Sequence, residues 1–111
     1  MHRTQIIGRV LFDDWLSFID GREIRLHEHV FDHLIRAERS LYDEGVLIRV
    51  VMEEKPRLIG WQRNGRFALY YRRSYGFLKL IVYANESVTI LTFMKVETMP
   101  DVRALPRWVL R

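Results

Sequence analysis

Cysteine is absent from this chain of 111 residues. Disulfide bonds, zinc–thiolate sites and thiol catalysis are therefore excluded, because each of them needs a cysteine sulfur. The sequence also lacks glycine-rich phosphate loops and the G-x-S-x-G pattern of serine hydrolases. A chain without cysteine is typical of a reducing compartment, so we expect a cytoplasmic protein.

Long apolar runs are missing as well. No run reaches the roughly 18 residues that a membrane-spanning helix requires, so no membrane contact is expected. Near the N-terminus, Arg9 and the Asp13–Asp14 pair interrupt the apolar residues, and we expect no signal peptide. The length predicts a single globular domain.

Acidic residues are scarce in the second half of the chain. Residues 57–111 contain 10 Lys and Arg against 3 Asp and Glu, whereas residues 1–56 contain 8 against 11. The formal charges of +7 and −3 sum to the +4 of the whole chain. A basic half indicates contact with a polyanion such as nucleic acid, and the alternative is that opposite charges pair across the fold. Arginine outnumbers lysine 15 to 3, which suits phosphate because a guanidinium can grip it with two hydrogen bonds.

The first half of the chain predicts a hairpin and two helices. Residues 6–12 fit either a strand or the start of a helix, and the Asp20-Gly21 dipeptide predicts a β-hairpin over residues 16–26. A helix is predicted over about 28–42, since its apolar residues recur at helical spacing: Val30, Leu34, Ala37 and Leu41. A second, shorter helix is predicted over about 46–54.

Four short strands are predicted after Pro56, at about 58–63, 66–73, 77–84 and 88–95. Short turns join them, of which Asn64-Gly65 is the strongest local signal. The predicted fold is therefore α+β in a single domain, with two N-terminal helices packed on a twisted four-stranded antiparallel sheet and an N-terminal hairpin. We divide it into an N-terminal extension (1–26), a core (27–96) and a C-terminal tail (97–111), which Trp108 is expected to pin to the body.

One face of the predicted sheet is cationic and aromatic. If Asn64-Gly65 is a two-residue turn, Arg63 lies opposite Arg66 and Trp61 lies opposite Ala68. Alternation then gathers one set of side chains: Trp61, Arg63, Arg66, Tyr70, Arg72, Lys79 and Tyr83. The other face is the predicted core, with Leu58, Phe67, Leu69, Tyr71, Leu78, Leu80 and Val82. Bases stack on aromatic rings and phosphates bind cations, so the first face predicts a platform for single-stranded RNA, and the alternative is an ordinary solvated surface.

The first predicted helix carries two histidines that could act in catalysis. His29, His33 and Arg36 lie at i, i+4 and i+7, on one line of that helix. Metal-free cleavage of RNA needs a base for the 2′-hydroxyl, cations for the phosphorane and an acid for the leaving oxygen. His29, His33, Arg66 and Tyr70 are candidates for these roles. The alternative is that the histidines make structural hydrogen bonds at the edge of the helix.

Two further features bear on catalysis, a possible metal site near the histidines and a threonine in the last strand. Glu28 or Asp32 could complete a metal site with the two histidines, but the H-E-x-x-H motif is absent and no His or Cys follows His33, so neither a metal nor another cofactor is predicted. Thr92 shares the alternation of Val88 and Ile90 in the last strand, which predicts that it faces the core.

Several segments resemble a known nuclease superfamily. In order, GREIRLHEHVFDHLIRA, EEKPRLIGW, RNGRFALYYRR, LKLIVYA and VTILTFMKV resemble the phage-associated branch of the barnase–EndoU–colicin–RelE-like nucleases, over about residues 20–96. This resemblance implies a RelE-like core with helices before a four-stranded antiparallel sheet. It also implies metal-independent RNA cleavage, often by a toxin of a toxin–antitoxin or phage-borne system. The positions that it matches are His29, His33, Arg36, Arg66, Tyr70, Arg72 and Thr92.

The leading hypothesis is thus a small metal-independent endoribonuclease that acts on free or ribosome-bound RNA. The alternatives are a non-catalytic nucleic-acid-binding module and a protein-interaction domain whose basic face meets an acidic antitoxin or immunity protein. A site in which His29, His33, Arg66 and Tyr70 surround one anion-sized space would support catalysis.

Overall fold

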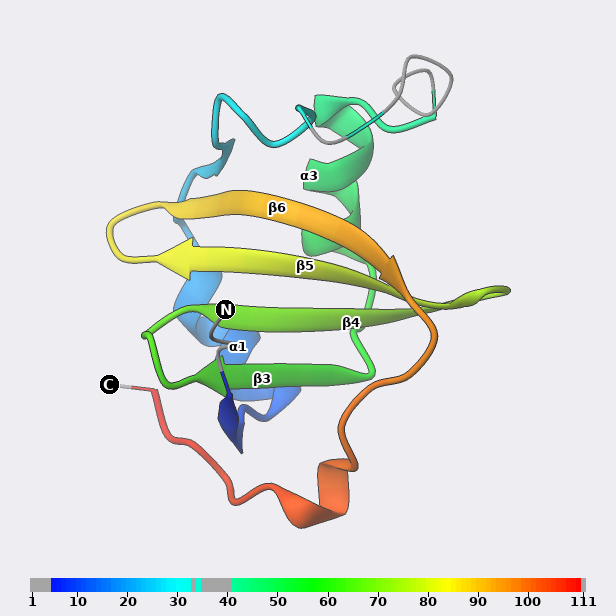
Figure 1. The fold of residues 1–111 in the computed structure, drawn as a ribbon. Helices are drawn as coiled ribbons and strands as arrows, with labels where there is room; N and C mark the ends of the chain where they lie inside the picture. The colour runs from blue at the N-terminus through cyan, green and yellow to red at the C-terminus, as the bar shows by residue number, and fades with distance from the viewer. Residues whose placement is uncertain (1–4, 33, 35–40, 111) are drawn as a thin grey trace.

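A computed structural model of the chain describes residues 5–32, 34 and 41–110. Its elements are, in chain order, β1 (Ile6–Arg9), α1 (Phe12–Ile19), β2 (Ile24–Leu26), α3 (Glu44–Glu53), β3 (Leu58–Gln62), β4 (Phe67–Arg73), β5 (Gly76–Ala84), β6 (Val88–Val96) and a 3₁₀ turn at Val102–Ala104. Both helices lie behind the sheet in the view of Figure 1. In these described ranges, no helix is long and apolar enough to span a membrane.

The six strands form one mixed sheet in the order β1-β3-β4-β5-β6-β2. All neighbours pair antiparallel except β2 and β6, which run parallel. The α+β class and the single domain are confirmed, but the predicted four-stranded antiparallel sheet is wrong. The segment 1–26, predicted as an extension with a hairpin, supplies both edge strands of the sheet.

The predicted N-terminal hairpin is wrong because its turn signal belongs to a helix end. Asp20 is the C-cap of α1, and its amide donates to the carbonyl of Leu16. Gly21 follows with φ of 76°, the left-handed conformation that commonly ends a helix. A hairpin turn asks for the same backbone conformation, so the dipeptide alone does not distinguish the two. α1 buries Trp15 against the sheet.

The first predicted helix is also wrong where the structure describes it. Residues 28–32 form successive turns, with Val30 donating to the carbonyl of His27 and Asp32 to that of His29. Val30 and Leu34 are buried as the apolar spacing predicted, but Leu41 is 67% exposed, so the predicted buried stripe is wrong at that position. The predicted positions 33 and 35–40 lie outside the described residues. The second predicted helix is confirmed as α3.

The face of the sheet toward α1 and α3, called the helix face below, holds the main core. Its strand residues are Ile59, Phe67, Leu69, Tyr71, Leu78, Leu80, Val82, Val88, Ile90 and Phe93. The predicted core set is confirmed except for Leu58, which lies on the opposite face. That opposite face, called the open face, carries Arg25, Leu58, Ala68, Tyr70, Arg72, Phe77, Lys79, Ile81, Tyr83, Thr89, Thr92 and Met94.

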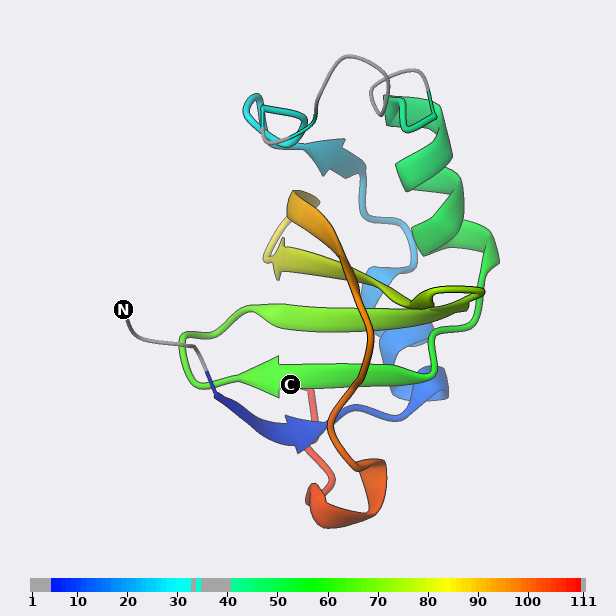
Figure 2. The ribbon, with the colours of Figure 1, turned by 45° about the vertical axis from the view of Figure 1, so that its right-hand side comes forward.

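The C-terminal tail, residues 97–110, covers only part of the open face. It leaves β6 and descends past β4 and β3 toward β1 (Figure 2). Met99, Val102 and Leu105 pack there on a small buried cluster that includes Tyr70 and Phe77.

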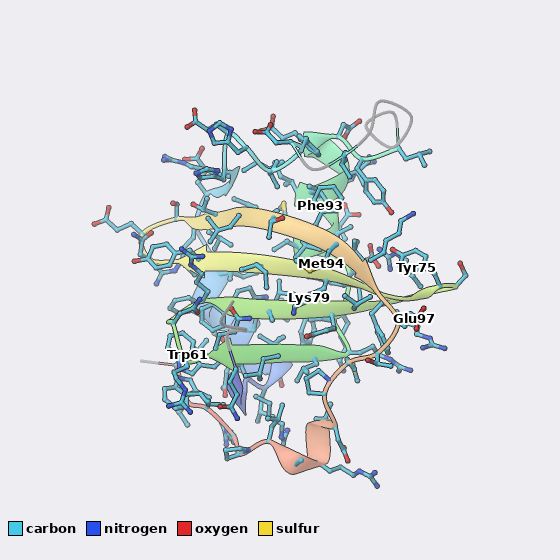
Figure 3. All side chains as sticks on the ribbon, viewed as in Figure 1. Trp61, Tyr75, Lys79, Phe93, Met94 and Glu97 are labelled. Atoms are coloured by element: carbon cyan, nitrogen blue, oxygen red, sulfur yellow. The ribbon has the colours of Figure 1, made fainter. Side chains whose placement is uncertain are left out.

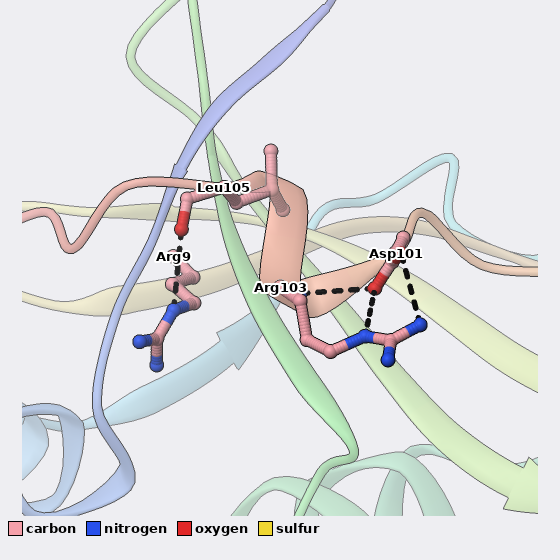
Figure 4. Close-up of polar contacts among 4 residues, drawn as sticks. All are labelled: Arg9, Asp101, Arg103 and Leu105. Atoms are coloured by element: carbon pink, nitrogen blue, oxygen red, sulfur yellow. Dashed lines mark hydrogen bonds and ion pairs between the residues drawn. The ribbon is translucent and has the colours of Figure 1, made fainter.

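Main-chain bonds join the tail to β1. Arg9 donates to the carbonyl of Pro106, and Trp108 donates to that of Arg9. The Arg9 side chain also bonds the carbonyl of Leu105, while Asp101 holds Arg103 (Figure 4). The tail therefore covers the outer edge of β1 and packs over β3, β4 and the Phe77 end of β5, whereas Tyr83 at the other end of β5 stays exposed.

Candidate nucleic-acid interface

The turn between β3 and β4 is one residue longer than predicted. Gly65, at φ 83°, donates to the carbonyl of Gln62, and Gln62 donates to that of Arg66. This is a three-residue loop with a glycine bulge, not a two-residue turn. Trp61 consequently pairs with Phe67 instead of Ala68, and the predicted pairing of Arg63 with Arg66 is wrong.

A shift of one residue moves a whole strand's side chains to the other face. Trp61 therefore lies on the helix face, edge-on to Phe67 at 4.9 Å between ring centroids and stacked on Trp108 at 5.3 Å. The stacking confirms that Trp108 pins the tail. Arg63 and Arg66 are exposed in the turn at the end of the sheet, and Arg63 donates to the side-chain oxygen of Gln5 at 3.2 Å. None of these three lies on the predicted RNA platform.

Four of the predicted platform residues do share the open face: Tyr70, Arg72, Lys79 and Tyr83. Tyr70 pairs directly with Lys79, whose Nζ lies 5.4 Å from the centre of the tyrosine ring. The Arg72 guanidinium lies 5.2 Å from the ring of Phe77. Tyr70 is almost fully buried and burial raises the pKa of its hydroxyl, so at neutral pH it is an uncharged group beneath the lysine. Figure 3 shows Lys79 and Met94 on neighbouring strands near the middle of the face.

Thr92 joins this surface because β6 contains a bulge. Ile81 pairs with Thr92, but Val82 pairs with Ile90, so Leu91 is an extra residue. The alternation of side chains reverses across such an insertion. The prediction that Thr92 faces the core is therefore wrong, and its half-buried side chain lies opposite Ile81 on the open face.

A row of side chains crosses three strands at one end of the open face. Thr89 of β6 pairs with Tyr83 of β5 on one side and with Arg25 of β2 on the other. Tyr83 is 44% exposed, and Arg25 bonds Glu23 at 2.8 Å, which lowers the pKa of that carboxyl. Sequence reasoning missed Arg25 because nothing local indicates that a three-residue strand pairs with a strand more than 60 positions later.

The strands themselves carry charge of only one sign. The six strand segments contain no Asp or Glu, and their basic residues are Arg9, Arg25, Arg72, Arg73, Lys79 and Lys95. Arg73 is neutralised by Glu54, with two hydrogen bonds of 2.9 Å. Arg25, Arg72 and Lys79 project from the open face, and Glu23, just before β2, pairs with Arg25, so Arg72 and Lys79 carry most of the positive charge that attracts anions.

Two histidines follow β2 at the edge of the sheet. The His27 amide donates to the carbonyl of Ile90, which extends the pairing with β6 by one residue. His27 Nδ1 accepts a hydrogen bond from the His29 amide at 3.2 Å. His29 Nδ1 lies 2.7 Å from an oxygen of Asp32, and Nε2 lies 3.5 Å from Glu28. A carboxylate on Nδ1 leaves Nε2 as the nitrogen that can exchange a proton.

The predicted catalytic residues do not converge on one anion-sized space in the described structure. His29 follows β2, whereas Arg66 precedes β4, three strands away, which is about 14 Å across the sheet at the usual strand spacing. Tyr70 belongs to β4, four residues after Arg66, and lies beneath Lys79. His33 and Arg36 fall outside the described residues. Among the residues that the structure covers, no group of three His, Cys, Asp or Glu side chains could hold a metal ion.

No protein-family model, curated protein or solved structure matches this chain. The candidate interface therefore rests on the residues and contacts described above.

Proposed function

We propose that this domain binds single-stranded RNA across the part of the open face formed by β5, β6 and β2. The observation that carries the proposal is the combination of an exposed aromatic ring with cations and hydroxyls on a surface whose strands contain no carboxylate. The same combination is how sheet surfaces hold RNA, since bases stack on rings and cations hold the phosphates.

Each residue type on this surface suits a different part of a nucleotide. Tyr83 offers a ring that is nearly half exposed, for stacking of a base. Arg25 and Lys79 lie two strands apart and at different levels along the sheet, so they suit two phosphates of one RNA strand that are not adjacent. The hydroxyls of Thr89 and Thr92 can donate to or accept from a 2′-hydroxyl or a base edge.

Titration of a fluorescently labelled single-stranded RNA, followed by anisotropy at several salt concentrations, tests this proposal. Tyr83→Ala is expected to weaken binding by about tenfold, the usual size of one lost base stack. Tyr75→Ala is the matched control, because Tyr75 is 37% exposed but lies at the opposite end of β5. Binding that is independent of salt, or equal losses in the two variants, would refute the proposal.

RNA cleavage at the edge of the same surface is a second candidate function. The 2.7 Å contact between His29 and Asp32 favours it, because an aspartate on Nδ1 orients an imidazole whose Nε2 can take the proton of a 2′-hydroxyl. That oxygen would attack the adjacent phosphorus to form a 2′,3′-cyclic phosphate, and the bond to the 5′-oxygen would break, so that it leaves as a 5′-hydroxyl with a proton from water. Arg25, two residues before His27 at the same edge, would stabilise the charge on the phosphate. The candidate site thus keeps His29 as the base that the sequence predicted, and Arg25 takes the place of Arg66 as the cation beside the phosphate.

Incubation of the protein with RNA in the presence of EDTA tests the cleavage candidate. Wild type is expected to cut RNA but not the same strand with 2′-deoxyribose, and His29→Gln is expected to remove cleavage while RNA binding persists. Intact RNA after incubation with wild type would refute the cleavage candidate, and RNA binding would remain as the proposed function. We also propose that the protein is cytoplasmic and that an acidic protein partner competes with RNA for the open face.

A further inference from the structure

A cavity of about 640 Å³ lies on the helix face, at the end of the sheet where β3 ends and β4 begins. It is lined by Phe18, Trp61, Phe67, Ala84, Arg107, Trp108, Val109 and Leu110. A second cavity, of about 450 Å³, shares Phe18, Val109 and Leu110 with the first and continues it along α1. Ligand sites of proteins commonly have this size and an apolar lining with few polar groups.

Three separate elements and the tail build this cavity. Trp61 comes from β3, Phe67 from β4 and Phe18 from α1, while Trp108 comes from the segment that pairs with Arg9. The tail approaches closely because Gly8 has no side chain: a Cβ there would lie 3.0 Å from the Cβ of Trp108. The backbone thus holds the indole of Trp108 against that of Trp61.

Aromatic rings make up half of the lining, which favours a flat ligand. Phe18, Trp61, Phe67 and Trp108 present ring faces or edges, and planar rings stack on such groups with defined geometry. Aliphatic side chains close the remaining wall. No carboxylate lines the larger cavity among the residues that the structure describes.

Two guanidinium groups stand at the rim. Arg107 lines the larger cavity and bonds Asp14 at 2.9 Å through one terminal nitrogen, which leaves its other nitrogens able to donate. Arg22 lines the smaller cavity, stacks on Phe18 at 4.4 Å and donates to the carbonyl of Asn85. Asp14 and Asp20 also line the smaller cavity, so an anionic group attached to the flat part of a ligand suits the larger cavity, beside Arg107.

We propose that this cavity is a second nucleotide site, which takes one base between the aromatic walls and its phosphate at Arg107. The choice of a nucleotide as ligand rests on the proposed function. Its position supports that choice, because Ala84 lines the cavity on the helix face while its neighbour Tyr83 projects from the open face. A strand bound at Tyr83 can pass the exposed Arg63 and Arg66 at the end of the sheet and place a base here.

Tryptophan fluorescence tests this site with free ligands. Titration with AMP, with adenosine and with inorganic phosphate is expected to give saturable quenching by AMP, weaker quenching by adenosine and none by phosphate. Ala84→Leu, which fills the cavity, is expected to weaken AMP binding by at least about tenfold. Arg107→Gln is expected to bring the affinity for AMP down to that for adenosine, and it serves as a second variant because Arg107 lies on the surface.

The outcomes separate this inference from the proposed function. Tyr83→Ala is expected to leave quenching by AMP unchanged, since that ring lies on the other face. AMP binding without RNA binding would refute the open-face proposal and keep the cavity site. RNA binding with no quenching by AMP, or with equal AMP affinity in wild type and Ala84→Leu, would refute the cavity site alone.

Discussion

The two faces of the sheet differ in how completely they are covered. On the helix face, α1, α3 and the strands form one cluster of 17 buried residues that includes Trp15 and Tyr71. On the open face, only Leu58, Ala68, Tyr70 and Phe77 are buried, beneath the tail. Alternate residues of the same strands therefore serve stability on one side and remain available for binding on the other. Variants of neighbouring residues can test this division directly.

The largest effect is expected from a truncation on the helix face. Leu80 is completely buried, and Leu80→Ala is expected to lower the free energy of unfolding by about 2–5 kcal/mol, because the change leaves a cavity. Ile81, the next residue, is only partly buried on the open face, so Ile81→Ala is expected to cost about half as much or less. Urea denaturation measures both. Equal losses would show that the open face is covered as fully as the helix face.

Two adjacent tyrosines extend the comparison to alkaline pH. Burial raises the pKa of Tyr71 on the helix face strongly and raises that of Tyr70 on the open face less; the nearby Glu54 raises that of Tyr71 further. A raised folded-state pKa means that stability is complete below the ordinary value of 10 and falls as the pH rises above it. Burial and a hydrogen bond to Tyr42 also raise the pKa of Tyr75, to about 12.

Urea denaturation between pH 8 and pH 12 measures this loss. Tyr71→Phe is expected to reduce the alkaline loss of stability more than Tyr70→Phe does. In addition, Tyr71→Phe removes a buried hydroxyl that has no hydrogen-bond partner among the described residues, so the variant is expected to match wild type at neutral pH. If Tyr70→Phe reduces the alkaline loss of stability more than Tyr71→Phe does, then the hydroxyl of Tyr70 on the open face is less solvated than that of Tyr71.

The sequence predicted the elements of the sheet better than their pairing. Apolar runs of strand-forming residues between turn residues located β3 to β6 within one or two residues. Pairing depended on insertions of single residues, the loop at Gly65 and the bulge at Leu91, which composition does not reveal. These two insertions moved Trp61 off the open face and Thr92 onto it.

The edges of the sheet could not be predicted from local patterns. β2 has only three residues, and its parallel partner, β6, lies more than 60 positions later in the sequence. Asp20-Gly21 satisfied a hairpin turn and a helix cap equally well, because both require a residue with positive φ. The excess of basic over acidic residues in the second half of the chain was informative nevertheless. Most of the sheet comes from that half, and its strands contain no carboxylate.

A smaller effect is expected where the tail covers the open face. Leu105 is partly buried against the cluster that contains Tyr70, so Leu105→Ala is expected to cost about 1–2 kcal/mol of unfolding free energy. Val109→Ala is the control, because that residue is 57% exposed near the end of the described tail and is expected to change stability by less than about 0.5 kcal/mol. A loss at Leu105 as large as that at Leu80 would mean that the tail belongs to the main core.

The smallest effect on stability is expected from a charge on the open face, although that charge matters for binding. Lys79 of β5 is partly exposed and its Nζ lies 5.4 Å from the centre of the Tyr70 ring, so Lys79→Gln is expected to cost less than about 1 kcal/mol. Its loss is expected to reduce the salt dependence of RNA binding by about 0.7 in the slope of log K against log salt, the value for one phosphate contact on a single strand. Arg49→Gln, on the exposed side of α3, is expected to leave the slope unchanged. Equal slopes for wild type and Lys79→Gln would show that no phosphate contacts Lys79, which contradicts the proposed site on β5.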